Sequence, residues 1–215
     1  MKKKVCIQGL GFVGFAMAIA VAKAKDKTTN LPLYDVVGVD LPTKDGKQKI
    51  SAINKGTFPI SCNDEELKKA YEDSLREGNI RASNNNKEFE NADIVIVDIN
   101  LDVSINGKSS EVDFSPLKKA IETVGVQIKK DTLVIIETTV PPGTTEKIIY
   151  PILKEILSER FNMECIPILA HSYERVMPGP QYLSSIINFW RVYAGINKKS
   201  ANKCKEFLST IINTE

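Results

Sequence analysis

Three glycines with the spacing G-x-G-x-x-G occupy the segment Gly9–Gly14 (GLGFVG) near the amino terminus. They follow a short apolar run and precede a stretch with helical periodicity, which is the context of a dinucleotide-binding turn. In such a turn Gly9 permits a tight bend, Gly11 lets the backbone approach a pyrophosphate, and Gly14 lets the helix pack closely on the strand. The amino terminus of the helix then offers free N–H groups and a partial positive charge to the phosphates. The alternative is a glycine turn without a ligand.

An aspartate, Asp40, ends the second apolar run. A carboxylate at this place can accept a hydrogen bond from a ribose 2′-hydroxyl and would repel a 2′-phosphate. The pattern therefore favours NAD over NADP as the cofactor. Lys44 lies close by in the sequence and keeps NADP open as an alternative.

Two more polar segments follow apolar runs, at 137–145 (ETTVPPGTT) and 171–179 (HSYERVMPG). Ligands of open α/β sheets bind outside the carboxyl ends of the strands, so these side chains are candidates for a site. Glu174 is able to orient a water or act as a general base, and the alternative is a surface pair with Arg175. His171, the only histidine, is more simply a structural residue than a catalytic base.

Short apolar runs alternate with longer helical stretches, which predicts βαβ units. We expect an α/β fold, a Rossmann-like doubly wound parallel sheet in a single domain. The expected strands are Val5–Gln8, Val36–Val39, Ile80–Ala82, Ile94–Val97, Leu133–Ile136, Ile166–Leu169 and Val192–Ala194. The expected helices are Phe12–Lys25, Lys47–Asn54, Asp64–Glu77, Pro116–Ile128, Thr144–Ser158 and Ser200–Ile212.

Three local expectations complete this assignment. The polar segment Asn100–Phe114 is interpreted as a loop, and Pro151 predicts a kink or a helix boundary near Tyr150. We expect the domain to span residues 1–195. Residues 196–215 would then begin a helix that leads to a region outside this chain.

Composition excludes several classes of protein. The 215 residues are 42% hydrophobic and 26% charged, unlike a disordered tail, a collagen-like fibre or a disulfide-framed miniprotein. A net charge of +2 gives no indication of binding to nucleic acid or to a membrane. The segment from Lys2 to Ala22 imitates a signal peptide, but Gln8 and the glycines dilute it, so we expect a cytoplasmic protein. The scattered cysteines are expected to be free thiols, with no metal site: Cys6, Cys62, Cys165 and Cys204.

The chain resembles the NAD-binding domain of the UDP-glucose/GDP-mannose dehydrogenase family. Gly9–Gly14 resembles the family's G-x-G-[YF]-V-G, Glu137–Gly143 resembles E-S-T-V-P-P-G, and Glu174–Gly179 resembles the end of S-P-E-R-V-x-P-G. Asn54–Ile60 also resembles the family's N-x-G-x-x-P-I. The form E-R-V-x-P-G is closer to the branch that oxidises UDP-N-acetyl-hexosamines than to the UDP-glucose branch.

The resemblance implies a nucleotide-sugar 6-dehydrogenase of polysaccharide biosynthesis, which oxidises the CH2OH of a UDP-sugar to a uronic acid with two NAD and acts as a homodimer. It implies that Thr139 and Glu174 lie at the reaction centre, where they bind or orient the hydrolytic water. It also implies the cofactor-binding residues, which are Gly9, Gly11, Phe12, Val13, Gly14, Asp40, Ser83, Thr138 and Thr139.

The chain departs from the family's pattern at several places. Tyr173 replaces a proline, and Ile99–Asp102 replaces V-P-T-P, the threonine of which contacts the cofactor. The family's nucleophilic cysteine, lysine and asparagine have no counterpart up to residue 215. We therefore expect the chain to bind NAD but not to oxidise a sugar by itself. The alternatives are a non-catalytic, stand-alone NAD-binding module and another class of dehydrogenase.

Overall fold

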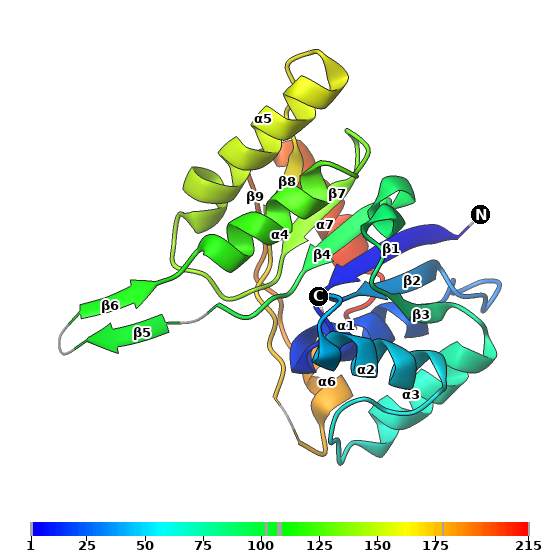
Figure 1. Ribbon diagram of the computed structural model, residues 1–215. Coiled ribbons are helices and arrows are strands. Elements are labelled where there is room, and N and C mark those ends of the chain that lie inside the picture. The colour runs from blue at the N-terminus through cyan, green and yellow to red at the C-terminus, as the bar shows by residue number, and fades with distance from the viewer. Residues whose placement is uncertain (1, 102, 107–108, 178, 215) are drawn as a thin grey trace.

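A seven-stranded sheet forms the centre of the molecule (Figure 1). The computed structural model describes residues 2–101, 103–106, 109–177 and 179–214. The strand order is β3-β2-β1-β4-β7-β8-β9, with all pairs parallel except β8 with β9. This order confirms the predicted doubly wound sheet, whose direction of winding reverses between β1 and β4. Its strands are β1 (Lys3–Gln8), β2 (Tyr34–Val39), β3 (Ile80–Ser83), β4 (Ile94–Val97), β7 (Leu133–Ile136), β8 (Ile168–His171) and β9 (Ala194–Gly195).

Helices cover both faces of the sheet (Figure 1). One face carries α4 and α5, and the other carries α1, α3, α6 and α7. The helices are α1 (Phe12–Lys23), α2 (Lys44–Asn54), α3 (Glu65–Arg76), α4 (Ser115–Gly125), α5 (Tyr150–Phe161), α6 (Tyr182–Ile187) and α7 (Lys198–Leu208). A 3-10 turn spans Asn86–Asn91, and a π-helical turn spans Thr145–Ile149. None of the helices in the described part of the chain is long and apolar enough to cross a membrane.

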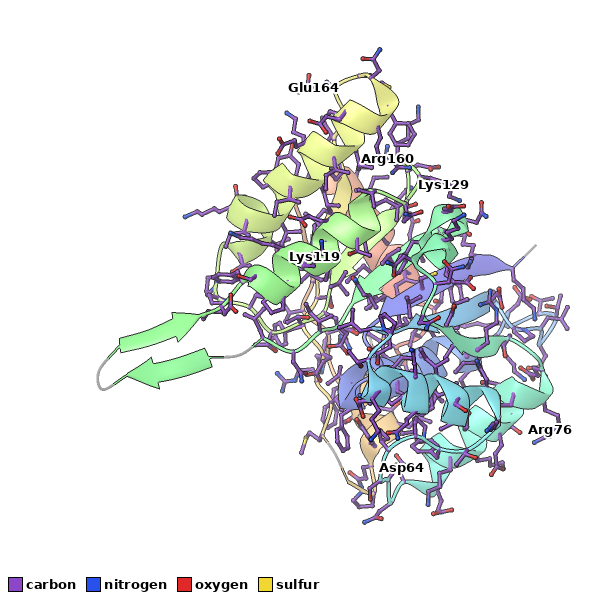
Figure 2. All side chains as sticks on the ribbon, in the orientation of Figure 1. Asp64, Arg76, Lys119, Lys129, Arg160 and Glu164 are labelled. Carbon is purple, nitrogen blue, oxygen red and sulfur yellow. The ribbon has the colours of Figure 1, made fainter. Side chains whose placement is uncertain are left out.

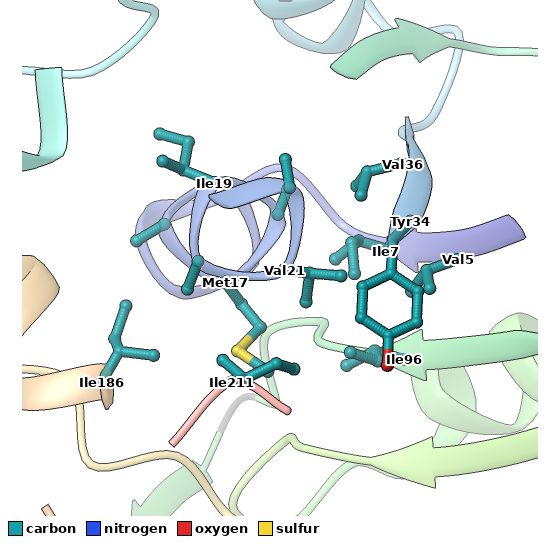
Figure 3. Packing of buried hydrophobic residues seen from close by; sticks show 14 of the residues in the cluster. Val5, Ile7, Met17, Ile19, Val21, Tyr34, Val36, Ile96, Ile186 and Ile211 are labelled. Atoms are coloured by element: carbon teal, nitrogen blue, oxygen red, sulfur yellow. The ribbon is translucent and has the colours of Figure 1, made fainter. Parts of the chain in front are cut away.

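The central strands β4 (IVIV) and β7 (LVII) are apolar and buried at every position because both faces of the sheet are covered. Val5 and Ile7 of β1 join the cluster on the α1 face, whereas Cys6 between them joins the cluster on the α4 face. Helix α1 lies deep in this arrangement, and every one of its residues from Gly14 to Ala22 is buried. Figure 3 shows Met17 of α1 close to Ile211, which follows α7. The first helix is therefore apolar on all sides, as a helix packed between a sheet and other helices must be.

The predicted loop at Asn100–Phe114 is wrong. This segment contains an antiparallel hairpin of β5 (Val103–Asn106) and β6 (Ser109–Val112), which projects from the body of the molecule (Figure 1). The pair Asn-Gly at 106–107 is a strong hairpin signal that the polar composition obscured. Asp102 lies outside the described residues.

Several predicted boundaries also shift. The strand expected at Ile166–Leu169 begins at Ile168, because Pro167 before it has no N–H to donate to the sheet. The strand expected at Val192–Ala194 is reduced to Ala194–Gly195, and α6 has no counterpart in the prediction. The helix expected at Ser200–Ile212 spans Lys198–Leu208, and its Cys204 is buried in the core. The domain boundary after residue 195 stays a prediction.

The predicted irregularity near Tyr150 is confirmed. The N–H of Tyr150 donates to the carbonyl of Thr145, which is the bond of a π-helical turn, and α5 begins there. Pro151 follows directly and lacks the N–H that a continuous helix would use. The expected single helix is therefore divided into two parts.

Asp64 joins two helices on the α1 face, and Figure 2 labels it near α3 and α6. One carboxylate oxygen accepts from the N–H of Leu67, 3.0 Å away, and so caps α3. The other accepts from the N–H of Leu183 in α6, 2.8 Å away. In turn the hydroxyl of Tyr182 donates to the carbonyl of Phe12 at 2.6 Å. Asp64 therefore supports, through α6, the turn that begins α1.

We expect the substitution Asp64→Ala to lower the free energy of unfolding by about 2 kcal/mol or more, because it removes a helix cap and leaves a second buried N–H without an acceptor. Urea unfolding measures this change. Asp131→Ala is the matched control, since Asp131 is exposed. Equal stabilities of the two variants would show that Asp64 does not join the helices.

Candidate functional site

The turn between β1 and α1 packs directly on the end of β4. Gly9 has φ +99° and donates its N–H to the carbonyl of Val39 at 2.8 Å. A Cβ on Gly9 would lie 2.0 Å from the carbonyl oxygen of Asp98, and a Cβ on Gly14 would lie 2.1 Å from the carbonyl oxygen of Gly9. Both contacts are with main-chain atoms, which cannot move aside. The fold itself therefore requires glycine at these two positions.

Gly11 differs from the other two glycines of the turn. Its φ is −73°, which any residue adopts, and a Cβ there would meet no atom within 4 Å. Neither the backbone conformation nor the packing demands a glycine at this position. The open space in front of Gly11, at the amino terminus of α1, fits the pyrophosphate of a dinucleotide.

Asp40 and Ser83 lie side by side at the ends of β2 and β3. The carboxylate of Asp40 accepts from the N–H of Leu10 at 3.2 Å and from the N–H of Leu41 at 2.7 Å. The N–H of Asp40 donates to the carbonyl of Ser83 at 3.1 Å. The hydroxyl of Ser83 accepts from the N–H of Asn85 at 3.0 Å and keeps its own proton available. Asp40 thus also fastens the glycine turn to β2, a role that its position in the sequence does not indicate.

The two threonines after β7 have different surroundings. The hydroxyl of Thr138 is buried, accepts from the N–H of Ile99 at 3.0 Å and lies 3.0 Å from the carbonyl of the same residue. Thr138 therefore ties the end of β7 to the chain that leaves β4. Thr139 is exposed, so its hydroxyl is the accessible one of the pair.

Glu174 lies in the loop after β8. Its carboxylate accepts a hydrogen bond from the N–H of Val176 in the same loop. It is close enough to Asp98 and Glu137 for its charge to raise the pKa of both. The structure thus brings Glu174 to the carboxyl edge of the sheet, as the sequence predicts. Pro178 of the same motif lies outside the described residues.

A buried ion pair lies beneath this edge. The guanidinium of Arg191 donates to Glu137 and to the carbonyl of Ser172, the latter at 3.2 Å. The side chains of Arg191 and Glu137 are 2% and 1% exposed. Burial raises the pKa of Glu137, and the positive charge of Arg191 opposes that rise.

Asp98, which directly follows β4, completes the charged cluster. Burial raises its pKa to about 8; the charges of Glu137 and Glu174 add to the rise, and Arg191 opposes it. One carboxyl oxygen, Oδ2, is buried and has no hydrogen-bond partner. Sequence reasoning missed Asp98 and Arg191. Asp98 was detectable, because it ends an apolar run as Asp40 does, but no local signal marks Arg191.

His171 ends β8 at the same edge and is half-buried. Burial lowers its pKa, so the imidazole is neutral at pH 7. Its Nδ1 atom is buried without a hydrogen-bond partner. The structure gives it no acidic or hydroxyl partner among the described residues, and its role stays a prediction.

A cavity of about 220 Å³ lies at the opposite, amino edge of the sheet. Its lining includes basic side chains (Lys3, Lys129 and Lys203) and acidic side chains (Asp93, Asp131 and Glu206). Lys129 and Asp93 already form an ion pair at 3.0 Å. The cavity offers neither a helix amino terminus nor a glycine turn to a phosphate, and it is distant from the motifs.

Comparison with known proteins places these features in a family. Residues 3–212 match the UDP-glucose/GDP-mannose dehydrogenase family, NAD binding domain. The UDP-N-acetyl-D-mannosamine dehydrogenase of Pyrococcus horikoshii is 28% identical over 97% of this chain and 45% of that protein. The enzyme of the same name from Methanococcus vannielii is 30% identical over 98% of this chain and 43% of that protein.

Solved structures give the same result. The NDP-N-acetyl-D-galactosaminuronic acid dehydrogenase of Methanosarcina mazei has a TM-score of 0.84 and 28% identity, over 100% of this chain and 43% of that one. The UDP-N-acetyl-mannosamine dehydrogenase from Pyrococcus horikoshii has a TM-score of 0.80. The chain thus spans less than half the length of these relatives.

The raised pKa of Asp98 predicts a pH dependence of stability. Between its ordinary value of 3.8 and about 8 the folded chain holds a proton that the unfolded chain releases, so stability decreases as the pH rises through this range. Asp98→Asn removes this loss. We expect the variant to be more stable than the wild type by more than about 1 kcal/mol at about pH 8, with the difference shrinking toward about pH 4.

Urea unfolding at several pH values measures the difference between variant and wild type. Asp131→Asn is the control, since its side chain is exposed at the other edge of the sheet. A wild type that is as stable as Asp98→Asn at about pH 8 would contradict the burial of an unpaired carboxyl at this place.

Proposed function

The chain belongs to the UDP-glucose/GDP-mannose dehydrogenase family, as its NAD-binding domain, and we propose from this that it serves as the cofactor-binding half of a nucleotide-sugar 6-dehydrogenase. The substrate class would be a UDP-N-acetyl-hexosamine, whose CH2OH is oxidised to a carboxylate with two NAD. The observation that carries the proposal is the open backbone at Gly11, between two glycines that the fold requires.

The cofactor would lie across the carboxyl edge of the sheet. The first N–H groups of α1 have no partner within the helix and would bind the pyrophosphate in front of Gly11. Asp40 and Ser83, on the β2 and β3 side, would accept from and donate to the adenosine ribose. The carboxylate of Asp40 would also exclude the 2′-phosphate of NADP. Phe12 and Val13 would border the pyrophosphate from the first turn of α1.

The other half of the dinucleotide would then lie over the ends of β4 and β7. NAD supplies the acceptor for a hydride from the sugar. Thr139, with its accessible hydroxyl, and Glu174 would bind and orient the water that hydrolyses the oxidised intermediate. One oxygen of Glu174 is held by the N–H of Val176, which fixes the carboxylate and leaves its second oxygen for the water.

The remaining groups of the reaction would come from a further region. By resemblance, the nucleophilic cysteine and the residues that bind the uridine diphosphate lie in a part of the relatives that this chain does not match. We also propose a homodimer for the full-length enzyme and a cytoplasmic location. The four free cysteines are compatible with that location.

The first test separates cofactor binding from folding. We expect Gly11→Leu to lower the affinity for NAD at least about tenfold, or 1.4 kcal/mol, because the side chain would fill the place of the pyrophosphate. Its free energy of unfolding should stay close to that of the wild type, because the added Cβ meets nothing. Calorimetric titration measures the affinity.

Gly14→Ala is the control, since a Cβ there overlaps the carbonyl of Gly9 and should destabilise the fold. NADP is titrated in parallel. Unchanged affinity of Gly11→Leu for NAD would refute the placement of the pyrophosphate. Equal affinity of the wild type for NAD and NADP would remove Asp40 from the ribose.

The second test concerns turnover. We expect the 215-residue chain, given NAD and UDP-N-acetylglucosamine, to form no NADH, because its described residues offer no uridine-binding region to hold the alcohol in line with the nicotinamide while its proton is removed. In a full-length enzyme that contains this domain, Glu174→Gln should slow release of the acid more than the first hydride transfer. Single-turnover measurements of NADH report the hydride transfers, and steady-state turnover reports the later release of the acid.

Oxidation of the sugar by the isolated chain would refute the proposal that a further region supplies the remaining groups of the reaction. Normal turnover of the full-length Glu174→Gln variant would remove Glu174 from the reaction. A third outcome is that the chain binds NAD but full-length proteins that contain this domain do not oxidise a UDP-sugar. In that case the non-catalytic module is the correct alternative.

A further inference from the structure

Three carboxyl groups lie close to one another and to the guanidinium of Arg191 at the carboxyl edge of the sheet. Asp98 follows β4, Glu137 follows β7 and Glu174 lies in the loop after β8, while Arg191 reaches them from the segment before β9. Four buried polar atoms in this cluster have no hydrogen-bond partner: Oδ2 of Asp98, Oε2 of Glu137, and Nε and Nη1 of Arg191. Buried polar atoms in native proteins are nearly always paired, so a group of unpaired ones at the edge where ligands of such sheets bind calls for a functional explanation.

Among the carboxyl groups of the cluster, Arg191 donates a hydrogen bond only to Glu137, and it does so through Nη2. Its guanidinium donates to that carboxylate and to the carbonyl of Ser172, and both charged side chains are almost completely buried. This pair is locally neutral. The backbone N–H of Asp98 is used in the sheet by Gln8. Asp98 and Glu174 therefore receive no hydrogen bond from Arg191, and of these two only Asp98 has a buried oxygen without a hydrogen-bond partner.

Asp98 also lies directly beside the glycine turn. Its carbonyl oxygen would be 2.0 Å from a Cβ on Gly9, and its Oδ2 would be 3.2 Å from a Cβ on Gly14. The sheet reverses its direction of winding between β1 and β4, and a dinucleotide crosses the sheet at that point. Since Asp40 and Ser83 occupy the β2 and β3 side, the nicotinamide end must lie on the side of Asp98.

The two redox states of the cofactor differ in charge at that end. The nicotinamide ring of NAD+ carries a positive charge, and the ring of NADH carries none. A carboxylate within a few ångströms of the ring, in surroundings of reduced dielectric constant, attracts the first and not the second. From the position of Asp98 beside the glycine turn, with a buried oxygen that has no hydrogen-bond partner, we propose that this residue selects the oxidised cofactor.

This inference rests on the proposed NAD site, and it has a consequence for protons. Because the pKa of Asp98 is raised to about 8, the carboxyl is mostly protonated at pH 7 in the free chain. A positive ring stabilises the ionised form, so binding of NAD+ should release a proton. The affinity for NAD+ should then rise with pH up to about 8, whereas the affinity for NADH should not.

The groups that face Asp98 come from every neighbouring element. Glu137 and Glu174 raise its pKa and Arg191 lowers it. From α6, Tyr182 faces the same cluster; burial raises the pKa of its phenol, the charges of Glu174 and Asp98 add to the rise, and the phenol stays neutral. Glu137 is held by Arg191 throughout, so Asp98 is the group whose proton responds to the ring.

Calorimetry with NAD+ and with NADH tests the proposal on the intact 215-residue chain. Titrations at about pH 6.5 and about pH 8.5, each in two buffers of different ionisation enthalpy, give the affinity and the number of protons released. We expect proton release on binding of NAD+ and none on binding of NADH. At the higher pH, Asp98→Asn should weaken NAD+ about tenfold, change NADH less than about twofold, and abolish the proton release.

Asp131→Asn, at the opposite edge of the sheet, is the matched control and should behave as the wild type. Urea unfolding of both variants verifies that they are folded. Equal weakening of NAD+ and NADH by Asp98→Asn, or proton release that persists in this variant, would overturn the selection by charge and leave the NAD site standing. Failure of the wild type to bind either form would overturn the proposed NAD site itself.

Discussion

The rest of the structure depends on the close packing of the β1–α1 turn on the end of β4. Gly9 has no side chain to meet the carbonyl of Asp98, and Gly14 has none to meet the carbonyl of Gly9. Helix α1 can therefore begin directly above the junction of β1 and β4. This placement buries α1 between the sheet, α3 and α6 and aims its amino terminus at the carboxyl edge. Tyr182 and Asp64 hold α6 against the same turn. One steric constraint thus gives both the core and the surface available to a phosphate.

The ion pair at the carboxyl edge of the sheet is buried, whereas many ion pairs elsewhere are exposed to solvent. Ion pairs such as Arg76–Asp73 and Lys154–Glu164 are exposed and contribute little to stability. The pair of Arg191 with Glu137 is buried, and burial of charge is unfavourable unless partners compensate for the lost water. The carbonyl of Ser172 is one such partner of Arg191, whereas Oδ2 of the nearby Asp98 has no hydrogen-bond partner. A carboxyl oxygen that is buried without a partner beside the glycine turn is typical of a functional site, and it supports the ligand-binding role that we propose for this edge.

The sequence predicts the architecture well because the information is local. Continuous apolar strands, a helix that is apolar on all sides and the G-x-G-x-x-G turn each specify their element without distant contacts. The hairpin β5–β6 was missed because polar composition was weighed above its Asn-Gly signal, and the six-residue α6 because it lies among proline, glycine and polar residues. Arg191 was not predictable, since only the folded chain brings it to Glu137 from 54 positions away. Which of Thr138 and Thr139 has a free hydroxyl likewise depends on the contact with Ile99. The roles of Thr139 and Glu174 in a reaction stay predictions.

A crystal structure of the 215-residue chain with NAD tests the central claim most directly. The account predicts the pyrophosphate in front of Gly11 at the amino terminus of α1, with the adenosine ribose at Asp40 and the nicotinamide on the side of Asp98. A dinucleotide bound elsewhere, for example in the 220 Å³ cavity between Lys3 and Lys203 at the opposite edge of the sheet, would contradict it.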